Sequence, residues 1–214
     1  YSNFEILGDG KLFFLAGSTL RIYDPATGLN TNYGLSNWFN YPEVNGNQIY
    51  AIREYEIIKI DVSDINNITT AVVAEPETAN ERFNERFALD GETLYYQTYH
   101  TVTGVDRVYR KEGNDNAVLL SAQENEYNDF YFIDGSLYAT RYSNELYKYV
   151  NGEWSYYIYS LNTIYGGKVF SNLIYVSEGN NVYATDITDI TYPEDENNNP
   201  IPPLLGTSQL SFTT

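Results

Sequence analysis

One stretch of this chain reads IDGSLYA at residues 133–139, and the stretch ELYKY follows it at residues 145–149. Asp-Gly favours a two-residue hairpin turn because both central residues of that turn take positive φ. Across the copies of this pattern, the residues after the turn are rich in Tyr, Ile, Val and Phe, which suit a pleated, half-buried strand. The stretch therefore predicts a strand, a tight turn and a second strand, with a third strand after a short connection.

The same pattern recurs along the chain. The turn residues that anchor its copies are Gly10, Gly46, Gly91, Gly135 and Asn172, so successive copies are 36, 45, 44 and 37 residues apart. A repeat near 40 residues made of short strands is typical of propellers and solenoids. No window shows a sustained helical period with caps.

Each repeat contains four candidate strands, and four antiparallel strands make one propeller blade. We therefore predict an all-β chain, a β-propeller of about five four-stranded antiparallel blades in one domain over residues 1–214. The predicted repeats span residues 1–37, 38–81, 82–126, 127–162 and 163–206. The fourth strand of the last repeat is placed at residues 201–205. Residues 207–214 are interpreted as one more strand, which either pairs beside the first blade or begins a further blade.

Two stretches carry a resemblance to known repeats: LRIYDPATG at residues 20–28 and IKIDVSD at residues 58–64. They resemble the bacterial β-propeller repeats of the YVTN, LVIVD and PQQ-type groups. The Trp-Asp dipeptide of WD-type blades is missing, as are suitably placed kelch double glycines. The resemblance implies a propeller over nearly the whole chain. It implies no activity, because such folds host many functions, and the Trp and cation ligands that PQQ enzymes need cannot be placed here.

Composition narrows the classes of function. The net charge is −17 and the sequence pI is about 4.2, so a phosphate backbone or an anionic membrane surface would be repelled. We predict no nucleic-acid partner, and no membrane insertion because no apolar run is long enough. The chain lacks Cys, which excludes disulfides and a thiol nucleophile and suits an extracellular, periplasmic or cell-surface location. It also lacks Met, so we expect Tyr1 to be a trimmed or processed start.

Four residues are candidates for ligand binding: Trp38, Tyr99, His100 and Trp154. The simplest interpretation of the aromatic residues, including most of the 23 Tyr, is that they pack between blades and have no role in ligand binding. The functional interpretation is that some of these Tyr and Trp side chains stack on the sugar rings of a ligand at one face of the propeller. His100 is the single histidine, and without a Gly-x-Ser-x-Gly elbow we predict no catalytic residue.

Acidic residues offer two further interpretations. Oxygen ligands suit Ca²⁺, and the candidates for such a site are Asp186, Asp189, Asp195 and Glu196, although their spacing matches no EF-hand. Otherwise this stretch is an exposed loop. The charged run at residues 75–85 is interpreted as a solvated loop, but loops are also where rigid scaffolds place binding residues.

Three functions remain open. The first is a non-enzymatic propeller that binds a glycan, a peptide or a protein partner, and the second is a structural domain of a larger surface protein. We favour these two merged: an extracytoplasmic binding or scaffold module. The alternative is a propeller-type glycoside hydrolase or lyase, which would need two nearby carboxyl groups. Glu5 and Glu43 lie at nearly equivalent inner-strand positions and are the candidates for that role.

Overall fold

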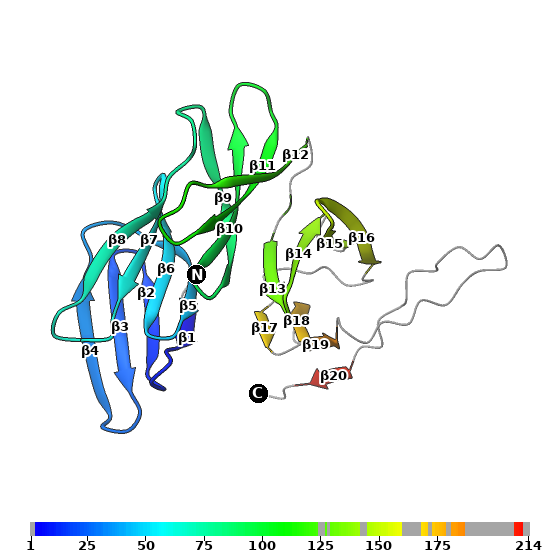
Figure 1. The fold of residues 1–214 in the computed structure, drawn as a ribbon. Coiled ribbons are helices and arrows are strands. Elements are labelled where there is room, and N and C mark those ends of the chain that lie inside the picture. Colours follow the sequence, from blue (N-terminus) through cyan, green and yellow to red (C-terminus); the bar gives the residue numbers. More distant parts are fainter. Residues whose placement is uncertain are drawn as a thin grey trace. The chain divides into compact units, whose positions relative to one another are not determined.

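The structure of this chain is a computed structural model, and it describes residues 3–123, 127, 129–141, 145–159, 168–170, 173–178, 181–186 and 208–211. The chain forms two compact units, Tyr1–Glu124 and Asn125–Thr214. Among the described residues, twenty strands form five antiparallel sheets of four strands each (Figure 1). In every sheet the strands are neighbours in chain order, which is the meander of a propeller blade.

The first unit contains three of the sheets. The first sheet consists of β1 (Asn3–Ile6), β2 (Leu12–Ala16), β3 (Thr19–Asp24) and β4 (Leu29–Gly34). The second consists of β5 (Asn40–Asn45), β6 (Gln48–Arg53), β7 (Glu56–Asp61) and β8 (Thr69–Ala74). The third consists of β9 (Glu81–Asp90), β10 (Thr93–His100), β11 (Asp106–Glu112) and β12 (Val118–Gln123).

The second unit contains the other two sheets. The fourth sheet consists of β13 (Asp129–Ile133), β14 (Ser136–Arg141), β15 (Glu145–Val150) and β16 (Glu153–Tyr159). The fifth consists of β17 (Lys168–Phe170), β18 (Leu173–Glu178), β19 (Asn181–Asp186) and β20 (Ser208–Ser211). Four strands per repeat are present in all five repeats, as the sequence pattern predicts.

The last strand corrects one prediction. β20 pairs with β19, Ser208 opposite Ala184 and Ser211 opposite Asn181, and so it is the fourth strand of the fifth sheet. This pairing makes it part of the fifth blade and not the start of a further one. The predicted strand at residues 201–205 lies outside the described residues. Connections between neighbouring strands are usually short, so the sequence favours the nearer apolar run at residues 201–205, whereas the structure pairs β19 with the more distant Ser208–Ser211.

A second correction concerns residues 75–85. Only residues 75–80 form a loop, and β9 begins at Glu81. A run of charge normally indicates a solvated loop, but here the Glu81 carboxylate within the run is buried against Arg107. Burial with a charged partner therefore allows this polar sequence to form a strand.

The turn chemistry also differs in part from expectation. In the fourth sheet, Asp134 and Gly135 are the two central residues of the hairpin, with φ of 45° and 72°. In the second and third sheets the paired strands extend one residue further, so the glycine is the first turn residue. Only Gly46 and Gly91 have positive φ in those two turns, because a II′-type turn needs it only at its first central position.

The hydrophobic core of the first unit lies between its sheets. One cluster joins the first and second sheets and consists of Leu7, Phe13, Leu15, Leu20, Ile22, Phe39, Ile49, Ala51, Ile58, Ile60 and Val62. Another joins the second and third sheets and consists of Tyr50, Ile52, Ile57, Ala74, Phe87, Leu94, Tyr96 and Tyr109. Alternate residues of β6 enter different clusters because successive strand side chains point to opposite faces. The second sheet is therefore buried on both faces.

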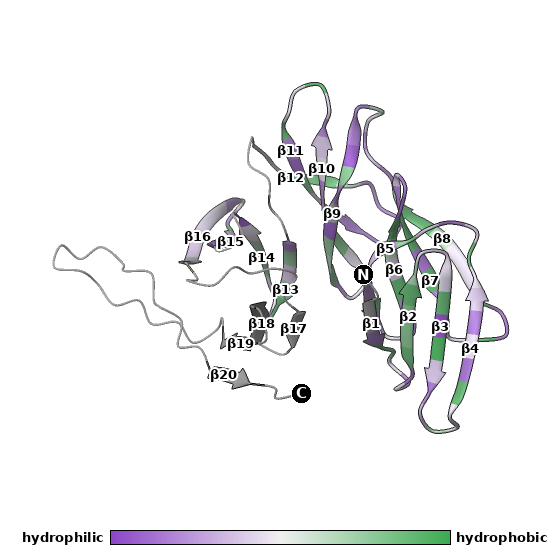
Figure 2. Ribbon diagram, turned by 180° about the vertical axis from the view of Figure 1, so that it is seen from behind, coloured by the Kyte–Doolittle hydropathy of each residue, from purple (hydrophilic) through white to green (hydrophobic). Residues whose placement is uncertain are grey.

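Hydropathy follows this packing. Figure 2 shows hydrophobic residues concentrated in β2, β3, β6 and β7, whereas β4 is largely hydrophilic. The residues of β4 are exposed or half-buried, as suits the outermost strand of its sheet. Each large apolar side chain that is fully buried contributes about 1.5–3 kcal/mol to folding, so the middle strands β2, β3, β6 and β7 contribute more to stability than β4 does.

The connections of the first unit that lie together at one end are named the loop face. They are residues 17–18, 35–39, 54–55, 75–80 and 101–105. Backbone hydrogen bonds tie several of them: Phe39 N–H donates to the Gly17 carbonyl at 3.1 Å, and Thr101 N–H donates to the Asn80 carbonyl at 2.8 Å. At the opposite end, Gly8 N–H donates to the Gly46 carbonyl at 2.7 Å. The sheets are thus linked at both ends.

Candidate binding pocket on the loop face

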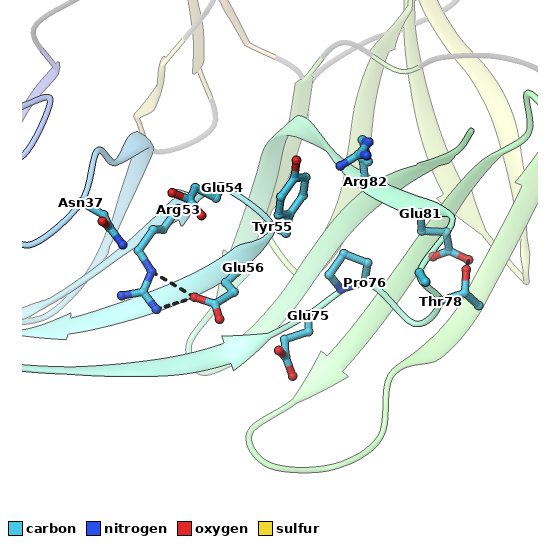
Figure 3. Close-up of a pocket in the computed structure, with 11 residues that line it drawn as sticks. Asn37, Arg53, Glu54, Tyr55, Glu56, Glu75, Pro76, Thr78, Glu81 and Arg82 are labelled. Carbon is cyan, nitrogen blue, oxygen red and sulfur yellow. Dashed lines mark hydrogen bonds and ion pairs between the residues drawn. The ribbon is translucent and has the colours of Figure 1, made fainter. Parts of the chain in front are cut away.

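A pocket of about 720 Å³ opens on the loop face between the second and third sheets (Figure 3). Its wall is made by the β6–β7 turn, the β8–β9 loop and the start of β9, with one residue of the β4–β5 loop. The lining residues are Asn37, Arg53, Glu54, Tyr55, Glu56, Glu75, Pro76, Thr78, Ala79, Glu81 and Arg82. Four carboxylates and two guanidinium groups therefore face a space that is large enough for a small ligand or a few side chains.

The β6–β7 turn forms one wall. Arg53 and Glu56 are directly opposite at its base, and the guanidinium donates to Glu56 Oε2 from Nε at 3.0 Å and from Nη2. Glu54 is the first turn residue and has a φ of 53°, in the region that favours glycine. The Arg53–Glu56 pair holds the base of the turn while the Glu54 side chain stays free of it.

Tyr55 supplies the aromatic surface of the pocket. Its side chain is 54% exposed, and the guanidinium carbon of Arg82 lies 4.7 Å from the ring centroid. Figure 3 shows these two side chains near each other on one side of Pro76. A guanidinium at this distance is attracted by the negative face of the ring, so the geometry already places a cation on Tyr55.

Glu81 forms the other side of the pocket and is the best-connected charge in it. Its side chain is fully buried. It forms an ion pair with Arg107 Nη1. Thr98 Oγ1 donates to Glu81 Oε2 at 2.8 Å, and Tyr109 Oη donates at 3.2 Å. Charged hydrogen bonds of this kind offset the cost of burying a carboxylate, and they anchor the loop that precedes Glu81.

Two tyrosines beneath Glu81 have shifted pKa values. Burial, with the Glu81 carboxylate adding to it, raises the pKa of Tyr109. Burial and the carboxylate of Glu77 raise the pKa of Tyr96 well above its ordinary value. The Tyr96 hydroxyl is buried and makes no hydrogen bond of standard geometry within the described residues. The hydrogen bond to Glu81 raises the pKa of Arg107, so that guanidinium stays charged.

Two lining carboxylates differ from the rest. Within the part of the chain that the structure describes, neither Glu54 nor Glu75 has a hydrogen-bond or ion-pair partner. Arg53 is taken by Glu56, and Glu81 is taken by Arg107. The pocket therefore keeps two unmatched carboxylates against the single guanidinium of Arg82.

Three of the four predicted ligand residues lie on or beside the loop face. Trp38 is 73% exposed, and its ring lies over Gly17, where an added Cβ would be 3.4 Å from it. Trp38 therefore does not fill the core. Tyr99 is 41% exposed near the end of β10. His100 Nδ1 accepts a hydrogen bond from Thr103 N–H at 3.2 Å, which stabilises the β10–β11 hairpin.

The fourth predicted residue, Trp154, lies in the second unit among aromatic rings. Its ring centroid is 4.7 Å from that of Tyr127, 5.2 Å from that of Tyr149 and 6.1 Å from that of Phe130. Trp154 therefore has the packing that is expected of an aromatic residue with a structural role. A ligand-binding role for all four residues stays a prediction.

Of the four predicted calcium ligands, only one lies within the described residues. Asp186 ends β19, and Asp189, Asp195 and Glu196 lie outside the described residues. Within the described residues, no group of three or more His, Cys, Asp or Glu side chains could hold a metal ion. Calcium binding at these four positions stays a prediction.

Glu5 and Glu43 occupy matching places in neighbouring sheets. Glu5 is opposite Phe13, and Glu43 is opposite Tyr50. Phe13 and Tyr50 hold equivalent positions in their hairpins, and β1 lies beside β5. Both carboxylates are half-buried and both have interaction partners.

The sequence drew attention to only part of this pocket. The charge of the β8–β9 loop indicates a binding segment, whereas the stretch REYE at residues 53–56 is too short to count as such a charge run. Its signal is a two-residue turn without glycine, asparagine or proline between two apolar strands, which is unusual for a hairpin.

Comparison with known proteins gives the fold. No protein-family model matches this sequence, and no curated protein matches it. A luciferin-regenerating enzyme is similar in structure, with a TM-score of 0.60 and 13% identity over 94% of this chain and 72% of that chain. Virginiamycin B lyase from Staphylococcus aureus has a TM-score of 0.54 and 12% identity over 99% and 69%. The Pan2 WD40 domain from Neurospora crassa has a TM-score of 0.59 and 7% identity over 94% and 65%.

At these identities the likeness concerns the fold alone. The chain is an all-β protein, a β-propeller of about five four-stranded antiparallel blades. The proteins of similar structure include two enzymes and one WD40 domain. The comparison therefore does not indicate whether this chain catalyses a reaction or binds a partner. A search of the described residues also finds no helix with the length and hydropathy needed to cross a bilayer.

Proposed function

We propose that this propeller is a non-enzymatic binding or scaffold module that works outside the cytoplasm and recognises a glycan, peptide or protein partner through its loop face. The observation that carries the proposal is the pocket of about 720 Å³ with two unmatched carboxylates, Glu54 and Glu75, beside the exposed ring of Tyr55. Exposed aromatic residues dominate the affinity of many interfaces. Trp38 follows the pocket residue Asn37 in the chain and adds a second exposed ring to the same face.

The test is a binding screen of the purified chain on a glycan array and a peptide array. We expect a saturable ligand, and we expect Trp38→Ala and Tyr55→Ala to weaken its binding by fivefold or more. Leu29→Ala is the matched control, because Leu29 is 56% exposed at the β3–β4 turn, which is at the opposite end of the first sheet. The proposal fails if no ligand of either class binds, or if the control weakens binding as much as the two aromatic changes do.

The second candidate is a glycoside hydrolase or lyase that uses Glu5 and Glu43. It is favoured by their matching positions on neighbouring inner strands, since such chemistry needs two carboxyl groups about 5–10 Å apart. The test is cleavage of a polysaccharide panel by the wild-type chain and by Glu5→Gln/Glu43→Gln. Turnover that the double change abolishes supports this candidate, and unchanged turnover removes both residues from it.

A further inference from the structure

The loop-face pocket has an unequal balance of charge. Its lining holds four carboxylates and two guanidinium groups. Two of these carboxylates are neutralised by neighbours: Glu56 by Arg53 and Glu81 by Arg107. The carboxylates of Glu54 and Glu75 are left, and neither has a partner among the residues that the structure describes. A ligand that brings positive charge would fill this deficit.

The aromatic ring of Tyr55 also favours a positively charged ligand. Its exposed ring already holds the guanidinium of Arg82 at 4.7 Å from the centroid. Because Tyr55 is 54% exposed, part of its π surface stays open to the guanidinium of a ligand. Glu54 and Tyr55 on the β6–β7 turn and Glu75 on the β8–β9 loop all line the same pocket. A polypeptide segment that fills the pocket would therefore lie near all three.

The whole chain favours the same kind of ligand. Its net charge is −17, and such a field raises the encounter rate with basic partners and suppresses that with acidic ones. Within the described residues, no group of three or more His, Cys, Asp or Glu side chains is placed so that it could hold a metal ion. A planar guanidinium, in contrast, matches carboxylates through paired hydrogen bonds and stacks on aromatic rings.

We propose that the pocket binds an arginine-bearing segment of a partner polypeptide, with Glu54 and Glu75 as carboxylate acceptors and Tyr55 as the stacking surface. This inference rests on the proposed binding function and names the class of partner. Lysine should bind more weakly at the same place, because an ammonium group cannot make the bidentate contact or stack as a plane.

The experiment measures fluorescence anisotropy with three labelled octapeptides, in which Gly alternates with Arg, Ser or Glu. We expect saturable binding of the Arg peptide only, weakened several-fold between 50 and 150 mM NaCl because solvent-exposed charge pairs are screened. Glu54→Gln/Glu75→Gln should weaken it tenfold or more. Tyr55→Leu, which keeps apolar bulk but removes the π face, should weaken it about two- to fivefold.

The control is Glu92→Gln/Glu112→Gln, which removes the same charge at the other end of the third sheet. Glu92 lies in the β9–β10 turn, and the Glu112 side chain is 60% exposed. We expect less than a twofold change from this pair. Equal weakening by both double variants would mean that only the overall field matters, and it would overturn the pocket assignment.

The remaining outcomes separate the two proposals. Equal binding of the Ser and Arg peptides, or binding of a neutral glycan that Glu54→Gln/Glu75→Gln leaves unchanged, overturns the arginine inference and leaves the binding module standing. A chain that binds no peptide and no glycan on the arrays overturns both. A folded state of the variants is checked by circular dichroism, and Glu54 and Glu75 are exposed enough for both changes to be tolerated.

Discussion

Replacement of Glu81 by Gln tests whether the buried carboxylate organises the third sheet. The Glu81 side chain is fully buried and pairs with Arg107, which is 29% exposed. Removal of one partner of a buried ion pair costs about 3–5 kcal/mol. The partly exposed guanidinium of Arg107 can turn to water, and Gln keeps the shape and one acceptor oxygen. We therefore expect a loss of about 2–3 kcal/mol in the free energy of unfolding.

The assay is urea unfolding followed by tryptophan fluorescence and circular dichroism. With a slope of about 2–3 kcal/mol per molar urea, the transition that reports on the first unit should shift by roughly 1 M. Glu112→Gln is the matched control, because its pair with Arg110 is exposed on both sides and exposed pairs contribute about 0–1 kcal/mol.

A double-mutant cycle with Arg107→Met isolates the pair. We expect a coupling of about 1–2 kcal/mol between the two positions, since residues in one hydrogen-bond network do not act additively. A loss below about 0.5 kcal/mol for Glu81→Gln, which is the usual range for a surface substitution, would refute the argument. So would additive effects of the two changes, because Glu81 would then act independently of Arg107.

Three further predictions concern stability. Gly8→Ala should destabilise by about 1–2 kcal/mol in urea unfolding, because its Cβ would lie 2.9 Å from the backbone of Gly46, whereas Gly34→Ala, which meets nothing within 4 Å, should not. Burial raises the pKa of Tyr96, so the unfolded chain ionises near pH 10 while the folded chain keeps its proton. Stability should therefore fall as pH rises above about 10, and Tyr96→Phe should make that fall less steep and be near neutral at pH 7. Lys148 lies 5.3 and 5.7 Å from two tyrosine ring centroids, so Lys148→Met should lose about 0.5–1 kcal/mol in the unfolding of the second unit; no loss would mean that water screens these contacts.

Much of the fold could be predicted because its signals are local. A hairpin is encoded within about ten residues by a turn residue with positive φ and by strand-forming residues on either side. Five repeats of this pattern therefore predict five blades. The position of the last strand was predicted wrongly, because a local strand signal does not show how far along the chain its pairing partner lies. β20 lies beyond residues 187–207, and nothing in a short window indicates that Ser208–Ser211 returns to pair with β19.

The candidate site was less predictable for a related reason. Its wall combines Asn37 from the first predicted repeat, the β6–β7 turn and the β8–β9 loop from the second, and Arg82 from the third, and these meet only when the sheets pack. Glu81 illustrates the limit. In the sequence it is one of several charges in a polar run, and only the contacts with Arg107, Thr98 and Tyr109 make it a buried anchor.

The sequence by itself determined an all-β chain of repeated four-stranded units, its turn positions and its strongly acidic character, because these depend on residue type and short-range spacing. Tertiary structure decided which charges are matched and which are left over. Arg53 neutralises Glu56 and Arg107 neutralises Glu81, while Glu54 and Glu75 keep no partner among the described residues. Electrostatic matching depends on distance in space, and Glu81 and Arg107, 26 residues apart in the chain, become neighbours only when β9, β10 and β11 pair in one sheet.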